Sequence, residues 1–128
     1  MVLPQSMRLK GHRCFNYLHR FGYRFHGSSM VLRVIKGNPK LLKPNYRDQK
    51  QDSCRCAVTI SSKVSKSAVK RNRLRRLLHD HLTIRLSNKR QFSQSWALLS
   101  LKPNSSTKEH IPLLEECDLL LRKAGLFV

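Results

Sequence analysis

The amino-acid sequence predicts an α+β fold of the α/β sandwich type, in which helices pack on a small mixed sheet in the order αβββαβα. Two kinds of segment carry this prediction. Leucines recur at helical spacing in residues 67–86 and again near the C-terminus, which is typical of helices that bury one face. Four shorter apolar segments are bounded by turn residues, which favours β-strands. With 128 residues, the chain suits one domain, residues 1–128, around a single core.

The N-terminal part predicts a helix followed by a hairpin. Residues 11–21 carry apolar side chains at helical spacing, and Gly22 follows as a stop signal. Residues 23–36 then read as two strands around a turn, the second of them β-branched and apolar. We expect Phe21 and Phe25 in the core, because aromatic side chains contribute much of the buried area of a small domain.

The middle of the chain predicts a loop and a third strand. Residues 37–53 contain prolines, a glycine and several basic side chains without periodicity, which indicates a long, flexible, basic loop. In residues 54–61, alternation places Cys54 and Cys56 on one strand face. Their spacing lacks the gap and the second pair that zinc sites use, so we interpret the cysteines as small buried residues with free thiols.

The second half of the chain predicts two helices and a fourth strand. The helix over residues 67–86 has Ser65 or Ser67 as its N-cap. Residues 96–102 read as a strand that a proline ends, and the last helix has Gly125 at its C-terminal end. The third strand, the long helix and the fourth strand are therefore placed to form a βαβ crossover.

Net charge limits the classes of function. The chain carries 26 Lys and Arg against 7 Asp and Glu, a formal net charge of +19. Such an excess opposes compaction by self-repulsion, which makes sense for a protein that works bound to a polyanion. No apolar run is long enough to span a membrane, and the N-terminus lacks a secretory signal, so we expect a cytoplasmic protein with no membrane partner.

The long helix begins with a concentrated run of like charge. Six of the eleven residues from Lys66 to Arg76 are basic, and only Asp80 follows as a counter-charge. Repulsion between neighbouring turns and with the helix dipole costs roughly a few tenths of a kcal/mol per contact. Phosphate binding explains this arrangement, because guanidinium groups match phosphate oxygens and a helix N-terminus offers free N–H donors. Asn72, within the run, can both donate and accept hydrogen bonds.

The sequence favours RNA over DNA as the polyanion. It contains no helix-turn-helix pairing, zinc finger or dimerising heptad repeat. Aromatic and histidine side chains alternate with basic ones over residues 15–26, which suits a single strand with splayed bases. Basic residues are also dispersed along the rest of the chain: Arg8, Lys10, Arg13, Arg20, Arg24, Arg33 and Arg55.

The segment KVSKSAVKRNRLRRLLHDHL, residues 63–82, resembles the signature of the bacterial ribonuclease P protein subunit. That signature is a strand followed by a helix with an Arg-Asn-Arg core, further basic residues and a leucine stripe. Here the core is Arg71-Asn72-Arg73. The N-terminal segment is similar as well, with Phe15 in a short helix and Gly22 after it.

The resemblance implies a ribosomal-protein-S5-domain-2-like fold with a left-handed βαβ crossover. It also implies a non-catalytic subunit of a ribonucleoprotein endoribonuclease that removes the 5′ leader of precursor tRNA. The partners would be the catalytic ribonuclease P RNA and the precursor tRNA, with no obligatory protein partner. Mg²⁺ would be the cofactor, held mainly by the RNA, and the protein would supply neither catalytic groups nor metal ligands.

The resemblance further assigns two sets of site residues. Binding of the catalytic RNA would use the signature helix and its flank: Lys63, Lys66, Lys70, Arg71, Asn72, Arg73, Arg75 and Arg76. The precursor's leader would lie in a cleft between the first helix and the sheet, formed by Phe15, His19 and Arg33. His19 stands where family members often have a second aromatic residue.

Three rival hypotheses remain open at this level. A ribosomal or RNA-assembly binding protein without an enzyme association would share the charge, the size and a similar fold. A DNA-binding regulator would need a dimer interface in addition to the core. A self-sufficient protein nuclease would need a carboxylate cluster that holds two metal ions, and the seven acidic residues, four of them around the last helix, do not suggest one.

Overall fold

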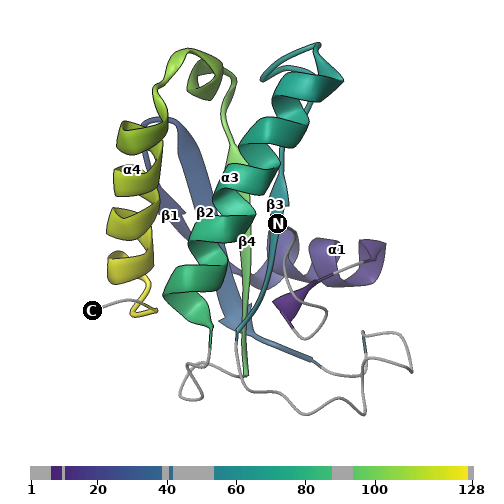
Figure 1. Ribbon diagram of the computed structural model, residues 1–128. Helices are drawn as coiled ribbons and strands as arrows, with labels where there is room; N and C mark the ends of the chain where they lie inside the picture. The colour runs from purple at the N-terminus through teal and green to yellow at the C-terminus, as the bar shows by residue number, and fades with distance from the viewer. Residues whose placement is uncertain (1–6, 10, 39–40, 42–53, 88–93, 127–128) are drawn as a thin grey trace.

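The computed structural model describes residues 7–9, 11–38, 41, 54–87 and 94–126 (Figure 1). Most of the predicted flexible loop at 37–53 lies outside these residues. The elements are α1 (His12–Phe21), β1 (Tyr23–His26), β2 (Met30–Lys36), β3 (Arg55–Thr59), α3 (Ala68–Leu86), β4 (Ser95–Leu101), the short 3-10 helix η4 (Pro103–Thr107) and α4 (His110–Lys123). The predicted order αβββαβα is confirmed, with η4 as an addition. Within the described part of the chain, no helix has the length and apolar character needed to cross a membrane.

The four strands form one mixed sheet in the order β1-β2-β4-β3. The β1–β2 and β2–β4 pairs are antiparallel, whereas β3 and β4 are parallel. In Figure 1 both parallel strands run upward, α3 lies in front of them, and the chain steps leftward from β3 to β4. This is a left-handed crossover, opposite to the usual hand of βαβ units.

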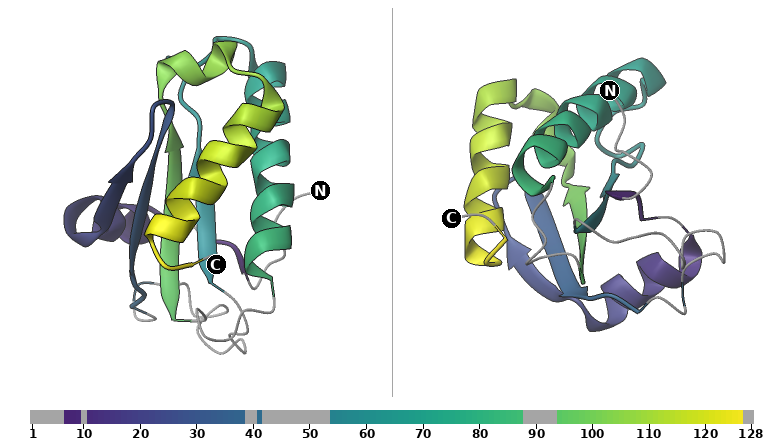
Figure 2. Two further views of the ribbon diagram at one scale, coloured as in Figure 1. Left: turned by 90° about the vertical axis from the view of Figure 1, so that its left-hand side faces the viewer. Right: turned by 60° about the horizontal axis from the view of Figure 1, so that its bottom comes forward.

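The sheet separates two layers of helices, so the single core expected from the sequence is divided (Figure 2). The larger cluster packs α3 and α4 on one face and includes Leu78 and Leu113, which are fully buried. The smaller cluster packs α1 on the other face around Leu18, Trp96 and Leu98. The reason is the alternation along each strand, which presents apolar side chains to both faces of a sheet that is covered on both sides.

The ends of the helices follow the predicted capping signals. The Ser67 hydroxyl accepts a hydrogen bond from the Lys70 backbone N–H at 3.2 Å, so Ser67 rather than Ser65 caps α3. A Cβ at Gly22 would collide with the Leu18 carbonyl, which explains the glycine after α1. Gly125 has φ 77°, and the backbone N–H groups of Gly125 and Leu126 bond back into the last turn of α4, an arrangement that glycine favours.

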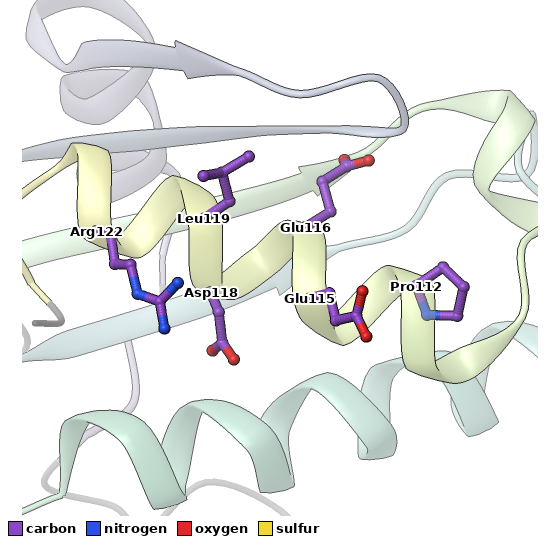
Figure 3. A pocket seen from close by; sticks show the side chains of 6 residues that line it. All are labelled: Pro112, Glu115, Glu116, Asp118, Leu119 and Arg122. Carbon is purple, nitrogen blue, oxygen red and sulfur yellow. The ribbon is translucent and has the colours of Figure 1, made fainter.

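Two carboxylates of α4 attach this helix to its neighbours (Figure 3). Glu116 accepts hydrogen bonds from the hydroxyls of Ser28 and Ser29 and from the Ser29 backbone N–H, at 2.6–3.0 Å, and so holds the β1–β2 turn. Asp118 faces α3, where it accepts two bonds from Arg85 at 3.1 Å and lies 2.7 Å from His81 Nε2. These contacts fix the position of α3, the helix with the Arg-Asn-Arg core.

Hydrogen bonding sets the charge state of both carboxylates. Partial burial alone would raise the pKa of Glu116, but hydrogen bonds from Ser28 and Ser29 outweigh it and lower that pKa. Burial would likewise raise the pKa of Asp118, and hydrogen bonds from Arg85 and His81 lower it instead. Both side chains are therefore ionised at neutral pH and serve as structural anchors of α4.

Candidate nucleic-acid interface

The N-terminal half of α3 and the segment before it form a basic surface. Lys63, Lys66, Lys70, Asn72, Arg73 and Arg76 are exposed there, and Arg71 and Arg75 are half-buried. The leucine stripe holds the opposite side of the helix in the larger cluster, through Leu74, Leu78 and Leu82. The predicted RNA-binding residues therefore share one side of the fold, with the charged groups of most of them in water.

Hydrogen bonds to neutral groups hold part of this surface in place. Arg71 donates to the Ser65 carbonyl at 2.7 Å, and Lys70 donates to the Ser106 carbonyl of η4 at 2.9 Å. Arg75 donates to the amide oxygen of Asn72 at 2.8 Å. Each of these cations keeps further donors, because a guanidinium has five N–H groups and an ammonium three. Asn72 thus orients Arg75 with a neutral acceptor, and the positive charge remains available.

In the described structure, none of the exposed cations of this surface forms an ion pair with a carboxylate. Further along α3, His81 and Arg85 contact Asp118 of α4 instead. The side chains of Arg73 and Arg76 contact no acceptor in the residues that the structure covers. Cations such as these, exposed on a rigid helix, are suited to a ligand that carries several phosphates, because each cation would gain a charge-assisted hydrogen bond to a phosphate.

A second basic region lies where α1 meets the sheet. Phe15 packs, partly buried, against the smaller cluster, while His19 is exposed one helical turn later. Arg33 on β2 pairs in register with Arg24 on β1, so both side chains are on the face that carries α1. The structure therefore brings together Phe15, His19 and Arg33, and it adds Arg24, which the sequence had placed only among the dispersed basic residues.

Burial and neighbouring cations set the electrostatics of this region. Partial burial, followed by the charges of Arg33 and Arg24, lowers the pKa of His19. Burial and the Arg24 charge lower the pKa of Arg33. The stretch of sequence from residue 11 to residue 47 contains no Asp or Glu at all. His19, Arg24 and Arg33 lie close together on one face, and a phosphate bound between them would stabilise their positive charge.

Two expectations about side chains are wrong. Arg55, expected with the dispersed surface charge, is only 1% exposed, and its guanidinium donates to the Arg8 carbonyl at 2.9 Å. Residues 7–9 run beside β3 and cover it, through a hydrogen bond from Leu9 N–H to the Cys56 carbonyl. Phe21, expected in the core, is 56% exposed because α1 ends beyond the edge of the packed cluster, whereas Phe25 does pack against the core.

The cysteines are buried residues with free thiols, as predicted. Burial raises the pKa of Cys54 and of Cys117 to about 12, so both thiols stay protonated and unreactive. Within the described ranges, no group of three His, Cys, Asp or Glu side chains is arranged to hold a metal ion. An open groove of about 610 Å³ along α4 is lined by Glu115, Glu116 and Asp118 among others, which makes it unsuited to a polyanion.

Comparison with known proteins places this arrangement in a family. The family model described as Ribonuclease P matches residues 3–125. The chain is 63% identical over 126 residues to the ribonuclease P protein component of Prochlorococcus marinus, covering 98% of both chains. It is 58% identical, with the same coverage, to that of Parasynechococcus marenigrum.

Solved structures of more distant proteins share the fold. The ribonuclease P protein of Staphylococcus aureus superposes with a TM-score of 0.74 at 16% identity, covering 95% of this chain and 98% of the other. That of Thermotoga maritima gives a TM-score of 0.65 at 16% identity, covering 91% and 96%. Taken with the basic α3, these matches show that the chain belongs to the ribonuclease P protein family, the protein components of the tRNA-processing ribonucleoprotein endonuclease.

Proposed function

We propose that the chain, as one domain over residues 1–128, binds the catalytic ribonuclease P RNA through the N-terminal half of α3. The observation that carries the proposal is the set of exposed cations there without a carboxylate partner in the described residues. The contact residues are those of the signature helix and its flank: Lys63, Lys66, Lys70, Arg71, Asn72, Arg73, Arg75 and Arg76. The RNA would hold the catalytic Mg²⁺, in a complex that works in the cytoplasm.

The precursor tRNA would be the second ligand of the protein. Its single-stranded 5′ leader would lie along the junction of α1 and the sheet, with a base against Phe15 and phosphates near His19 and Arg33. Arg24 belongs to the same set because its charge acts on both His19 and Arg33. The replacement of an aromatic residue by His19 makes this leader site depend more on charge and less on stacking.

The test is cleavage of a precursor tRNA at low Mg²⁺ with the protein alone, a bacterial ribonuclease P RNA alone, and both together. Cleavage at the mature 5′ end only with both components would support the proposal. If the protein failed to stimulate cleavage by the RNA and bound other structured RNAs tightly, the proposal would be replaced by a ribosomal or RNA-assembly role.

The leader site predicts a pH dependence. The pKa of free His19 lies below its ordinary value of 6.5, and a bound phosphate would raise it, because the phosphate stabilises the protonated ring. Affinity for the leader should therefore rise as the pH falls from neutrality to below 6.5. We expect a holoenzyme with His19→Gln to lose this rise. The measurement is the dissociation constant of precursor tRNA divided by that of mature tRNA across pH, which cancels effects on the shared tRNA body. An identical profile in the variant would remove His19 from the site.

A further inference from the structure

The short helix η4 lies beside the first turns of α3, at the upper end of the molecule in Figure 1. The Lys70 ammonium of α3 donates a hydrogen bond to the Ser106 carbonyl of η4 at 2.9 Å. Residues 102–108, which we name the η4 segment, therefore adjoin the basic surface of α3, although they belong to the connection from β4 to α4. An RNA bound to the start of α3 would meet the η4 segment as well.

The η4 segment has a fixed conformation. Pro103 stands at its first turn, where the proline ring restricts the backbone. The hydroxyl of the buried Ser105 donates a hydrogen bond to the Lys102 carbonyl at 2.6 Å. The Thr107 hydroxyl likewise donates to the Asn104 carbonyl at 3.0 Å. A segment held in this way needs little ordering when a ligand binds, which limits the entropy cost of binding.

Side-chain contacts also attach the η4 segment to the β1–β2 turn. The Lys102 ammonium donates to the Gly27 carbonyl at 2.8 Å. The Asn104 amide donates to the Ser28 carbonyl at 2.9 Å. Glu116 of α4 holds the same turn through the hydrogen bonds described above. The η4 segment, the turn and the start of α3 are therefore fixed relative to one another and form one surface.

Positive charge predominates where the η4 segment meets α3. Lys108 is exposed at the end of the segment, and Lys70 keeps two of its three N–H donors for a ligand. Glu109, the next residue, is the single carboxylate in the sequence between residues 81 and 114. The local balance of Lys70, Lys102 and Lys108 against this one carboxylate favours an anionic ligand.

The neutral polar groups of the η4 segment suit the sugar edge of RNA. Asn104 and Thr107 are exposed. The Asn104 amide has a second N–H and an acceptor oxygen beyond its bond to the turn, and the Thr107 oxygen can accept a hydrogen bond. An RNA double helix presents 2′-hydroxyls and phosphates together across its wide minor groove. Amide and hydroxyl groups beside ammonium groups match this combination.

We propose that the η4 segment is a second contact for the catalytic ribonuclease P RNA, with Lys108 on a phosphate and with Asn104 and Thr107 on the sugar edge of an RNA helix. The inference rests on the proposed function, because it extends the RNA surface of α3. The precursor's leader is not the ligand of this segment, since α1 and the proposed leader site lie on the opposite face of the sheet from α3 (Figure 2).

The first test measures how the affinity of Lys108→Ala for a bacterial ribonuclease P RNA depends on salt. Loss of one phosphate contact should weaken binding about 5-fold and make the log–log salt slope less steep by about 0.7–0.9. Lys123→Ala is the matched control, because it removes the same charge from an exposed site in the last turn of α4 and should keep the wild-type slope. Lys108→Arg keeps the charge and should behave like the wild type. Thermal unfolding checks that each variant is folded.

The second test locates the RNA directly. An iron–EDTA group attached to the thiol introduced by Thr107→Cys generates radicals that cleave the nearby RNA backbone. The four native cysteines are buried, so the reagent attaches to the new, exposed thiol. We expect cleavage of the catalytic RNA at discrete nucleotides in the absence of precursor tRNA. The same group on Lys123→Cys should give no such cleavage.

Three results would each overturn the inference: a wild-type salt slope for Lys108→Ala, no cleavage from Thr107→Cys, or equal effects in the Lys123 controls. Failure of the proposed function is distinguishable from these results. In that case Arg71→Ala with Arg73→Ala would bind the catalytic RNA like the wild type, whereas that pair still weakens binding if only the η4 contact is wrong.

Discussion

Replacing Arg71 and Arg73 together by alanine should weaken binding of the catalytic RNA by about 100-fold or more while the fold survives. A hydrogen bond to a charged group contributes roughly 1.5–3 kcal/mol, so two lost phosphate contacts are sufficient for this effect. Arg73 is exposed and contacts no described acceptor, and Arg71 makes one bond to a backbone carbonyl. The measurement is a binding titration with ribonuclease P RNA at fixed salt, accompanied by urea unfolding of each protein.

A charge-matched control distinguishes a site from the general attraction of a +19 protein for RNA. Arg122→Ala with Lys123→Ala removes the same two charges from exposed positions in the last turn of α4, at the end of the molecule away from the start of α3 (Figure 1). That pair should reduce affinity only a little, because long-range attraction is screened beyond about 10 Å at 0.1 M salt. Equal losses in both pairs would mean that α3 is not the RNA contact.

Sequence reasoning predicted α3 almost completely because the signals for this helix are local. The leucine stripe predicted which side of the helix is buried, and the serine N-cap signals predicted where the helix begins. The structure places the N-cap at Ser67. The strands were predicted for the same reason, since side-chain alternation depends only on near neighbours along the chain. The family resemblance supplied the left-handed crossover, which no local signal in the sequence specifies.

The features that were missed depend on contacts between distant segments. Arg55 is buried because residues 7–9 lie beside β3, and nothing near Arg55 in the sequence indicates that cover. The carboxylates of α4 had no explanation until the structure placed Glu116 on the β1–β2 turn. Arg24 joins the proposed leader site only through its register with Arg33 across the β1–β2 pair.

Charge and fold class alone left a ribosomal or assembly protein as an equal alternative. The Arg-Asn-Arg helix directly after a strand favoured ribonuclease P, and identities of 58% and 63% over nearly the whole chain decide the family. A carboxylate-based protein nuclease is also disfavoured by what the acidic residues do. Among the described ones, Glu116 and Asp118 are occupied with holding helices and a turn together.

Replacing Asp118 by alanine should lower the free energy of unfolding by about 2–3 kcal/mol. The substitution removes the carboxylate that Arg85 and His81 contact on α4, and losing hydrogen bonds to a partly buried charged group is costly. The effect stays below that of a fully buried pair because the Arg85 side chain is 35% exposed. Urea unfolding measures it, with Glu115→Ala, an exposed neighbour on the same helix, as the control that should change little.

The same carboxylate predicts how stability depends on pH. The pKa of Asp118 in the folded protein is lowered from its ordinary value of 3.8, so its contribution is present above that value and is lost as the pH falls through the folded pKa. Protonation of Glu116, whose pKa is lowered from its ordinary value of 4.5, causes a further loss of stability as the pH falls below that value. Both proteins should lose stability below about pH 4.5 through Glu116, and the wild type should fall more steeply than Asp118→Ala below about pH 3.8, where Asp118 becomes protonated. Parallel curves would show that Asp118 contributes no differential stability, and that shape and packing alone hold α4 against α3.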